Sequence, residues 1–121
     1  MLTNRERVTR GLELLTEGLY PFVERQLRAF YKDDWLRAAR RSYREDRSRI
    51  LPKGDVVRWD AHTLLTVMWD HWNSVFKQKL GPLERSLVCE IRDFRNRWAH
   101  QQDFDFCDTF RVLDSIERLL R

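Results

Sequence analysis

Residues 8–30 carry a long apolar stripe, and this stripe limits what the chain can fold into. Apolar side chains recur there every three or four positions, which is the spacing of one helix face; they are Val8, Leu12, Leu15, Leu19, Val23, Leu27 and Phe30. Thr3 followed by Glu6 is a capping box, so a helix should begin at about Asn4. Pro21 predicts a kink or a short break, because proline lacks the amide donor and clashes one turn back. Because the stripe keeps its phase, both halves should pack as one long element.

A second helix is expected from residue 35 to about residue 46. Asp33 or Asp34 can provide its amino-terminal cap. Its apolar content is thin, and arginine dominates its polar positions. Residues 48–58 contain a proline and a glycine, and they predict a loop.

Three more helical patterns follow in the second half of the chain. Their apolar stripes run over 64–80, 83–98 and 106–120. Asp60 and Asp105 can cap the first and the last of these helices, while Gly81 and Pro82 separate the first from the second. No segment alternates for long enough to predict a strand. We therefore expect an all-α bundle of four to six helices, up-and-down in its main part, with a long first helix kinked near Pro21.

Length and composition exclude several classes of protein. At 121 residues the chain should form one domain, small enough that dimerisation would help it. No apolar run approaches the roughly 20 residues that span a bilayer, and the amino end is polar, so we expect a cytoplasmic protein without a membrane segment. Cys89 and Cys107 lie far apart and outside any CxxC motif, which predicts reduced packing residues. His62 and His71 lack ligand spacing and should be ordinary surface or half-buried residues, so we expect no metal and no cofactor.

The basic residues are mostly arginine. Nineteen of the 23 Lys and Arg residues are Arg, and the net charge is +4. A GC-rich genome can produce this bias, but guanidinium is also the better phosphate ligand. Arg37, Arg40, Arg41 and Arg44 lie in the second helix and could follow an RNA backbone, with Tyr43 offering a surface for base stacking. The competing interpretation is an exposed helix with solvated charges.

Arg95, Asn96 and His100 are the candidate catalytic residues. Arginine is a permanent cation with a forked geometry suited to phosphate. Histidine exchanges protons near neutral pH, and His100 should lie in the last turn of its helix or just beyond it, where the carboxyl end favours a cationic ring. This pair can cut a phosphodiester without metal, if a base takes the 2′-OH proton, a cation neutralises the phosphorane and an acid protonates the leaving oxygen.

Helix geometry restricts how these residues can cooperate. On a continuous helix Arg95 and His100 would lie roughly 140° apart, whereas Asn96 and His100 would share a face. Either the helix loosens near His100, or His100 works with an arginine from another chain. A two-fold dimer would also supply a second histidine, so that acid and base need not be the same residue.

Taken together, these residues resemble the HEPN superfamily, and specifically its Swt-type subgroup. The R-[polar]-x3-H pattern of Arg95, Asn96 and His100 carries the likeness, along with segments across nearly the whole chain: RGLELL (10–15), GLYPFVER (18–25), MWDHWNSVF (68–76), GPLERSLV (81–88) and DFRNRWAH (93–100). The resemblance implies a metal-independent ribonuclease whose two protomers line a shared groove, with 2′-OH attack and a cyclic phosphate product. It also implies that residues 1–121 are the amino-terminal part of a longer, ATPase-containing protein, in some cases one of phage defence.

Other interpretations remain open at this point. The chain could be a non-catalytic HEPN module for dimerisation or for nucleic-acid or nucleotide binding, or a toxin controlled by an antitoxin. The motif could also be structural only. Arg97 should form a solvated salt bridge, and Trp98 should belong to the core or to a dimer interface, since it is in phase with Ile91 and Phe94.

Overall fold

The computed structural model describes residues 2–45, 59–100 and 102–120. Within these ranges the chain forms helices joined by turns and loops and has no strand. The elements are α1 (Asn4–Tyr31), the 3-10 turn η1 (Lys32–Asp34), α2 (Trp35–Glu45), α3 (Ala61–Asp70), the 3-10 turn η2 (Phe76–Gln78), α4 (Pro82–Ala99) and α5 (Phe106–Leu120). This confirms the all-α prediction. The expected loop over 48–58 lies outside the described residues. No described helix is long and apolar enough to cross a bilayer.

The helix α1 begins where the capping box predicts. The Glu6 amide donates to Thr3 Oγ1 at 3.1 Å, and the helix continues through Pro21 without interruption. Its stripe is buried from Val8 to Leu27. Phe30, the last member of the predicted stripe, is instead 49% exposed and packs edge-on against Tyr31. The stripe therefore ends one turn earlier than predicted, and Tyr31 instead makes the inward contact of the last turn, with His71.

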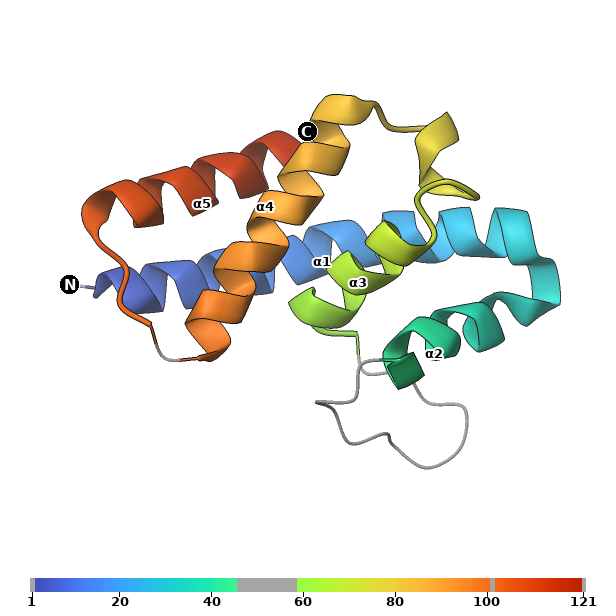
Figure 1. Cartoon of the computed structure of the whole chain (residues 1–121), viewed down its shortest axis with the longest axis horizontal. Coiled ribbons are helices and arrows are strands. Elements are labelled where there is room, and N and C mark those ends of the chain that lie inside the picture. Colours follow the sequence, from blue (N-terminus) through green and yellow to red (C-terminus); the bar gives the residue numbers. More distant parts are fainter. Residues whose placement is uncertain (1, 46–58, 101, 121) are drawn as a thin grey trace.

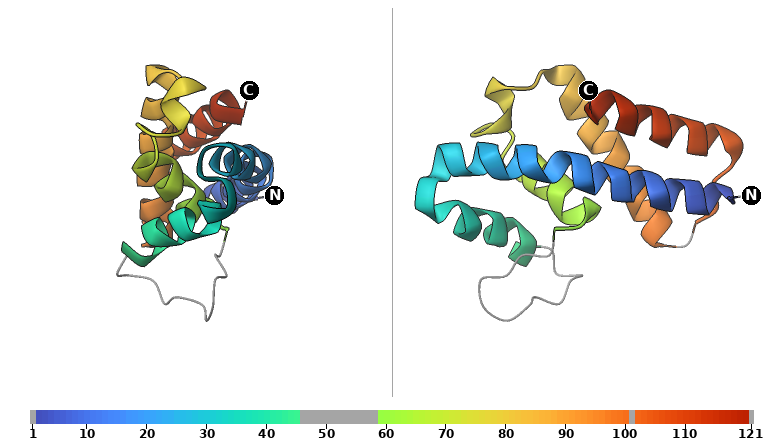
Figure 2. Two further views of the ribbon diagram at one scale, coloured as in Figure 1. Left: turned by 90° about the vertical axis from the view of Figure 1, so that its right-hand side faces the viewer. Right: turned by 180° about the vertical axis from the view of Figure 1, so that it is seen from behind.

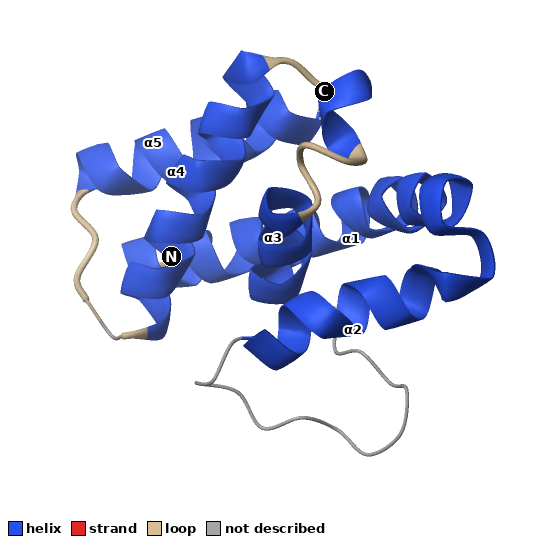
Figure 3. Cartoon of the chain, turned by 45° about the vertical axis from the view of Figure 1, so that its right-hand side comes forward, coloured by secondary structure: helices blue, strands red, loops and turns tan. Residues whose placement is uncertain are grey.

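The helices pack around α1, which runs the length of the molecule (Figure 1). The helix α2 returns antiparallel to α1, and α4 crosses α1 obliquely (Figures 1 and 2). The helix α5 lies along the amino-terminal half of α1 and runs in the same direction, since a Cβ at Gly11 would meet Leu113 and one at Gly18 would meet Leu120. The direction of α5 agrees with the predicted up-and-down arrangement, in which the first and fifth helices run the same way, while α4 departs from it by crossing obliquely (Figure 1). Figure 3 shows α3 between α2 on one side and α4 and α5 on the other.

The central helix α3 is shorter than predicted. Asp60 caps it, accepting from the Thr63 amide at 2.9 Å, and every residue from 61 to 68 is buried. The helix ends at Asp70, not near residue 80 as the stripe predicts. His71 explains the difference, because its ring is held between Tyr31 Oη (2.7 Å to Nδ1) and the Ala38 carbonyl (3.2 Å to Nε2). Both His71 and His62 are buried, not surface or half-buried residues as predicted.

The two carboxyl-terminal helices begin where the sequence predicts. Pro82 occupies the first turn of α4, and the Asp108 amide donates to Asp105 Oδ1 at 2.7 Å at the start of α5. The predicted apolar stripe over 106–120 is buried only in part, since its members Phe106 and Phe110 are 70% and 63% exposed. The buried face of α5 instead contains Thr109, Val112, Ser115, Ile116 and Leu119. These smaller side chains allow α5 to approach both α1 and α4 closely.

Candidate functional site

His100 lies at the carboxyl end of α4 and is exposed. Its amide donates to the Asn96 carbonyl at 3.0 Å, so the helix remains regular through Ala99 and ends at His100, as predicted. Asn96 and Arg95 are half-buried in the last turns of the same helix. The helix does not loosen before His100, so the wide angular separation between Arg95 and His100 persists within one chain.

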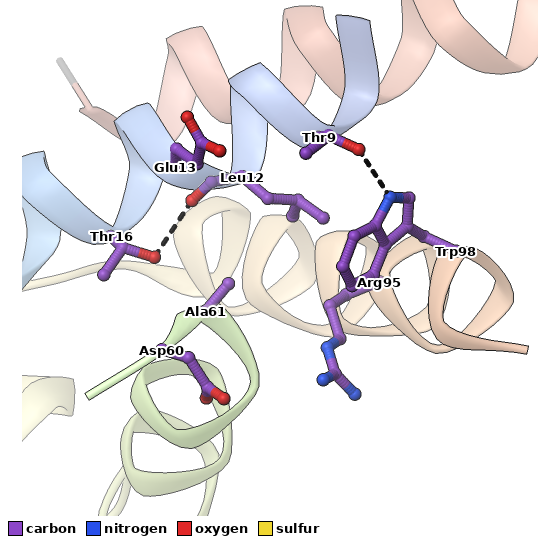
Figure 4. Close-up of a pocket in the computed structure, with 8 residues that line it drawn as sticks. All are labelled: Thr9, Leu12, Glu13, Thr16, Asp60, Ala61, Arg95 and Trp98. Carbon is purple, nitrogen blue, oxygen red and sulfur yellow. Dashed lines mark hydrogen bonds between the residues drawn. The ribbon is translucent and has the colours of Figure 1, made fainter. Parts of the chain in front are cut away.

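Arg95 faces a cavity between α1, α3 and α4. The cavity has a volume of about 230 Å³ and is lined by Thr9, Leu12, Glu13, Thr16, Asp60, Ala61, Arg95 and Trp98. Figure 4 shows the guanidinium of Arg95 extending from α4 on the side where the Asp60 carboxylate also projects. His100 does not line this cavity. The structure therefore places Arg95 and His100 near the same end of α4 without bringing them into one pocket.

The first turns of α1 hold the end of α4 in place. Arg5 Nη2 donates to the Trp98 carbonyl at 2.8 Å, and its guanidinium lies 5.3 Å from the centre of the Trp98 ring. The Trp98 indole N–H in turn donates to Thr9 Oγ1 at 2.8 Å (Figure 4). On the far side of His100, Asn4 Nδ2 donates to the Phe104 carbonyl at 3.1 Å. We call Asn4, Arg5 and Thr9 the α1 clamp. It fixes the backbone before and after His100.

Sequence reasoning missed the α1 clamp. Its members lie about ninety to one hundred residues from the groups that they contact, and no local pattern marks them. The only sequence hint was the position of Trp98 in phase with the core. Trp98 is half-buried and packs against the core, which agrees with its predicted place there.

Arg97 ties α4 to α5. Its Nη2 donates to Asp108 Oδ2 at 3.0 Å, and both side chains are about one-third exposed. The hydrogen bond from Arg97 lowers the pKa of the Asp108 carboxyl below its ordinary value. The guanidinium also lies over the rings of Phe94 and Phe104, at 5.1 and 5.2 Å. The predicted salt bridge is present, and Arg97 is occupied by a structural role.

The arginines of α2 do not form one uniform surface. The Arg37 side chain is 80% exposed, and its Nη1 lies 3.8 Å from Asp34 Oδ1. Arg41 is also exposed, but Arg40 is half-buried. The side chain of Arg44 lies outside the described residues, as does that of Tyr43. Arg37 and Arg41 are therefore the members that can reach a solvent-side phosphate directly.

The described residues contain no group of three or more His, Cys, Asp or Glu side chains that could hold a metal ion. Cys89 and Cys107 are free thiols, and both are exposed, so their predicted role in packing is wrong. Cys89 lies in α4 and Cys107 in α5.

Comparison with protein families decides what the chain is. The model of the Swt1-like HEPN family matches residues 10–121. The chain is a member of the HEPN_Swt1 family. Comparison with curated proteins and with solved structures found no match. The HEPN match includes Arg95, Asn96 and His100 but begins after the α1 clamp, so these three clamp residues are outside the segment that identifies the family.

Proposed function

We propose that this HEPN chain is a metal-independent endoribonuclease that acts as a two-fold dimer. Arg95 binds and neutralises the scissile phosphate, His100 serves as the general acid and base, and Asn96 orients one or both of them. The observation that carries the proposal is the exposed His100 at the end of α4, with Arg95 facing solvent through a cavity in the same region.

The geometry of α4 supports a dimeric site. Because α4 stays helical through Ala99, one copy presents Arg95 and His100 on different sides. A second copy related by a two-fold axis brings another Arg95 and another His100 to the same phosphodiester. Two histidines then divide the tasks of acid and base, and the 2′-OH attacks to leave a cyclic phosphate.

The exposed arginines of α2 add contacts to the RNA backbone in this proposal. Arg37 and Arg41 reach solvent directly, and we include Arg40 and Arg44 as members of the same helix. Their contacts would be independent of base sequence and would weaken as salt concentration rises.

The alternative is a HEPN module that dimerises or binds nucleic acid without cutting it. The contact of Arg95 with the Trp98 ring, 5.9 Å from guanidinium carbon to ring centre, favours it, because a guanidinium engaged by a neighbouring ring can have a packing role. In this alternative His100 ends the helix and has no chemical role.

One assay separates the two. The purified protein is incubated with total RNA in EDTA, beside His100→Ala, Arg95→Ala and a control, Arg92→Ala, which removes a half-buried arginine from the same helix. The nuclease predicts cleavage with cyclic phosphate ends in wild type and in the control, and none in the other two variants. Intact RNA with wild-type protein that dimerises normally would favour the binding module. Cleavage that survives loss of His100 would reject the proposed mechanism.

A further inference from the structure

The cavity beside Arg95 has the size of a binding site for one ring system. Pockets for drug-sized ligands run from about 300 to 1,000 Å³, and this cavity, at about 230 Å³, is smaller. Leu12, Ala61 and Trp98 give it apolar walls. A planar heterocycle fits such a space, while an attached sugar and phosphate would remain outside near Arg95.

The polar lining of the cavity offers mainly hydrogen-bond acceptors. Thr9 and Thr16 donate their hydroxyl hydrogens to the Arg5 and Leu12 carbonyls, so their oxygens can only accept from a ligand. Thr9 Oγ1 already accepts from the Trp98 indole N–H, which leaves Thr16 as the more available acceptor. Glu13 adds a carboxylate whose present partner is Arg10, in an ion pair with both side chains more than half exposed. Such an exposed ion pair contributes little to stability, so the carboxylate can exchange Arg10 for a ligand at a small cost in free energy.

These properties select among the nucleobases. An acceptor-lined site needs a ring that brings N–H donors, and a carboxylate accepts best from two adjacent donors. The Watson–Crick edge of guanine presents two such donors side by side, whereas that of uracil presents one between two carbonyls. Single-stranded RNA commonly has its bases read on this edge after they leave the stack.

We propose that the cavity binds a guanine base of the RNA, with Glu13 accepting from its Watson–Crick edge, next to the phosphate held by Arg95. The inference rests on the proposed function for the identity of the substrate. It makes the enzyme selective for the nucleotide adjoining the cleaved bond. A guanidinium group from a protein partner would also satisfy Glu13, because Asp60 gives the lining a second carboxylate beside its one cation, Arg95, and the test below includes such a group.

The test titrates mononucleotides into the whole chain in EDTA. Binding is measured by the change in the NMR chemical shift of the Trp98 indole N–H. Guanosine monophosphate should bind about tenfold or more tightly than inosine monophosphate, which lacks the exocyclic amine. Glu13→Gln should abolish this preference. The matched control is Glu17→Gln, an exposed carboxylate one turn along α1 that does not line the cavity, and it should bind like wild type.

Equal binding of the two nucleotides to wild type, or an unchanged preference in Glu13→Gln, would overturn the inference. Methylguanidinium that shifts the Trp98 signal at lower concentration than guanosine monophosphate would also overturn it, in favour of a protein partner. The readout does not depend on cleavage. If RNA stays intact while guanosine monophosphate binds selectively, the nuclease proposal fails and the guanine site stands. If RNA is cleaved but guanosine monophosphate binds no better than inosine monophosphate, only the guanine site is rejected.

Discussion

The α1 clamp predicts that Arg5→Gln will destabilise the end of α4 that carries His100. The substitution removes a charged hydrogen bond of 2.8 Å to the Trp98 carbonyl, of a kind that contributes about 1.5–3 kcal/mol. It also removes a guanidinium 5.3 Å from the Trp98 ring centre, worth roughly 0.5–1 kcal/mol at an accessible site. Arg5 is half-buried, so we expect a loss of about 2–3 kcal/mol in the free energy of unfolding.

Thermal unfolding measures this loss. For a chain of this length, each kcal/mol corresponds to roughly 4 °C in Tm, so Arg5→Gln should lower Tm by about 8–12 °C. The control is Arg7→Gln, which removes an exposed arginine from the same turn and should change stability by less than about 0.5 kcal/mol. Hydrogen exchange adds a local readout, because the His100 amide bonds to the Asn96 carbonyl and should exchange faster only in Arg5→Gln. Equal melting of the two variants, with His100 equally protected in both, would refute the clamp.

Three further predictions concern stability. A Cβ would lie 2.6 Å from Leu113 Cδ2 at Gly11 and 2.7 Å from Leu120 Cδ2 at Gly18. Leu120 is 38% exposed at the end of α5 and can move aside, so Gly18→Ala should raise stability by about 0.5–1 kcal/mol through helix propensity. Gly11 is buried, so Gly11→Ala should be neutral or destabilising in the same urea titration. His71→Ala should cost about 2–3 kcal/mol in urea unfolding, because both ring nitrogens are hydrogen-bonded, and a loss under 0.5 kcal/mol would contradict this. The hydrogen bond from Arg97 lowers the pKa of Asp108. The ion pair therefore stabilises the fold fully above the ordinary pKa of 3.8, and this stabilisation disappears as the pH falls through the lowered pKa. The difference in stability between wild type and Asp108→Asn should shrink over that acid range.

Local signals explain why the helix starts could be predicted. Thr3, Asp60 and Asp105 each bond to a backbone amide three residues later, so the information lies within one turn. Gly81 and Pro82 begin α4 for an equally local reason. The motif could also be placed at the end of its helix, because the apolar stripe of α4 stops there.

Long-range contacts explain what the sequence could not predict. The stripe through Leu80 is compatible with a longer α3, but His71 is bound by residues of α1 and α2, and these contacts override the helical pattern. The helix α5 has two apolar stripes, and its packing against α1 and α4 decides that Val112 is buried while Phe110 is exposed. Arg5 acts on a carbonyl 93 residues away, which no pattern along the chain could indicate.

The α1 clamp also orders events during protein synthesis. Asn4 bonds to Phe104, 100 residues later, so this contact around His100 cannot form until all of α4 and the segment through Phe104 have left the ribosome. Closing so long a loop is a late and slow step in folding.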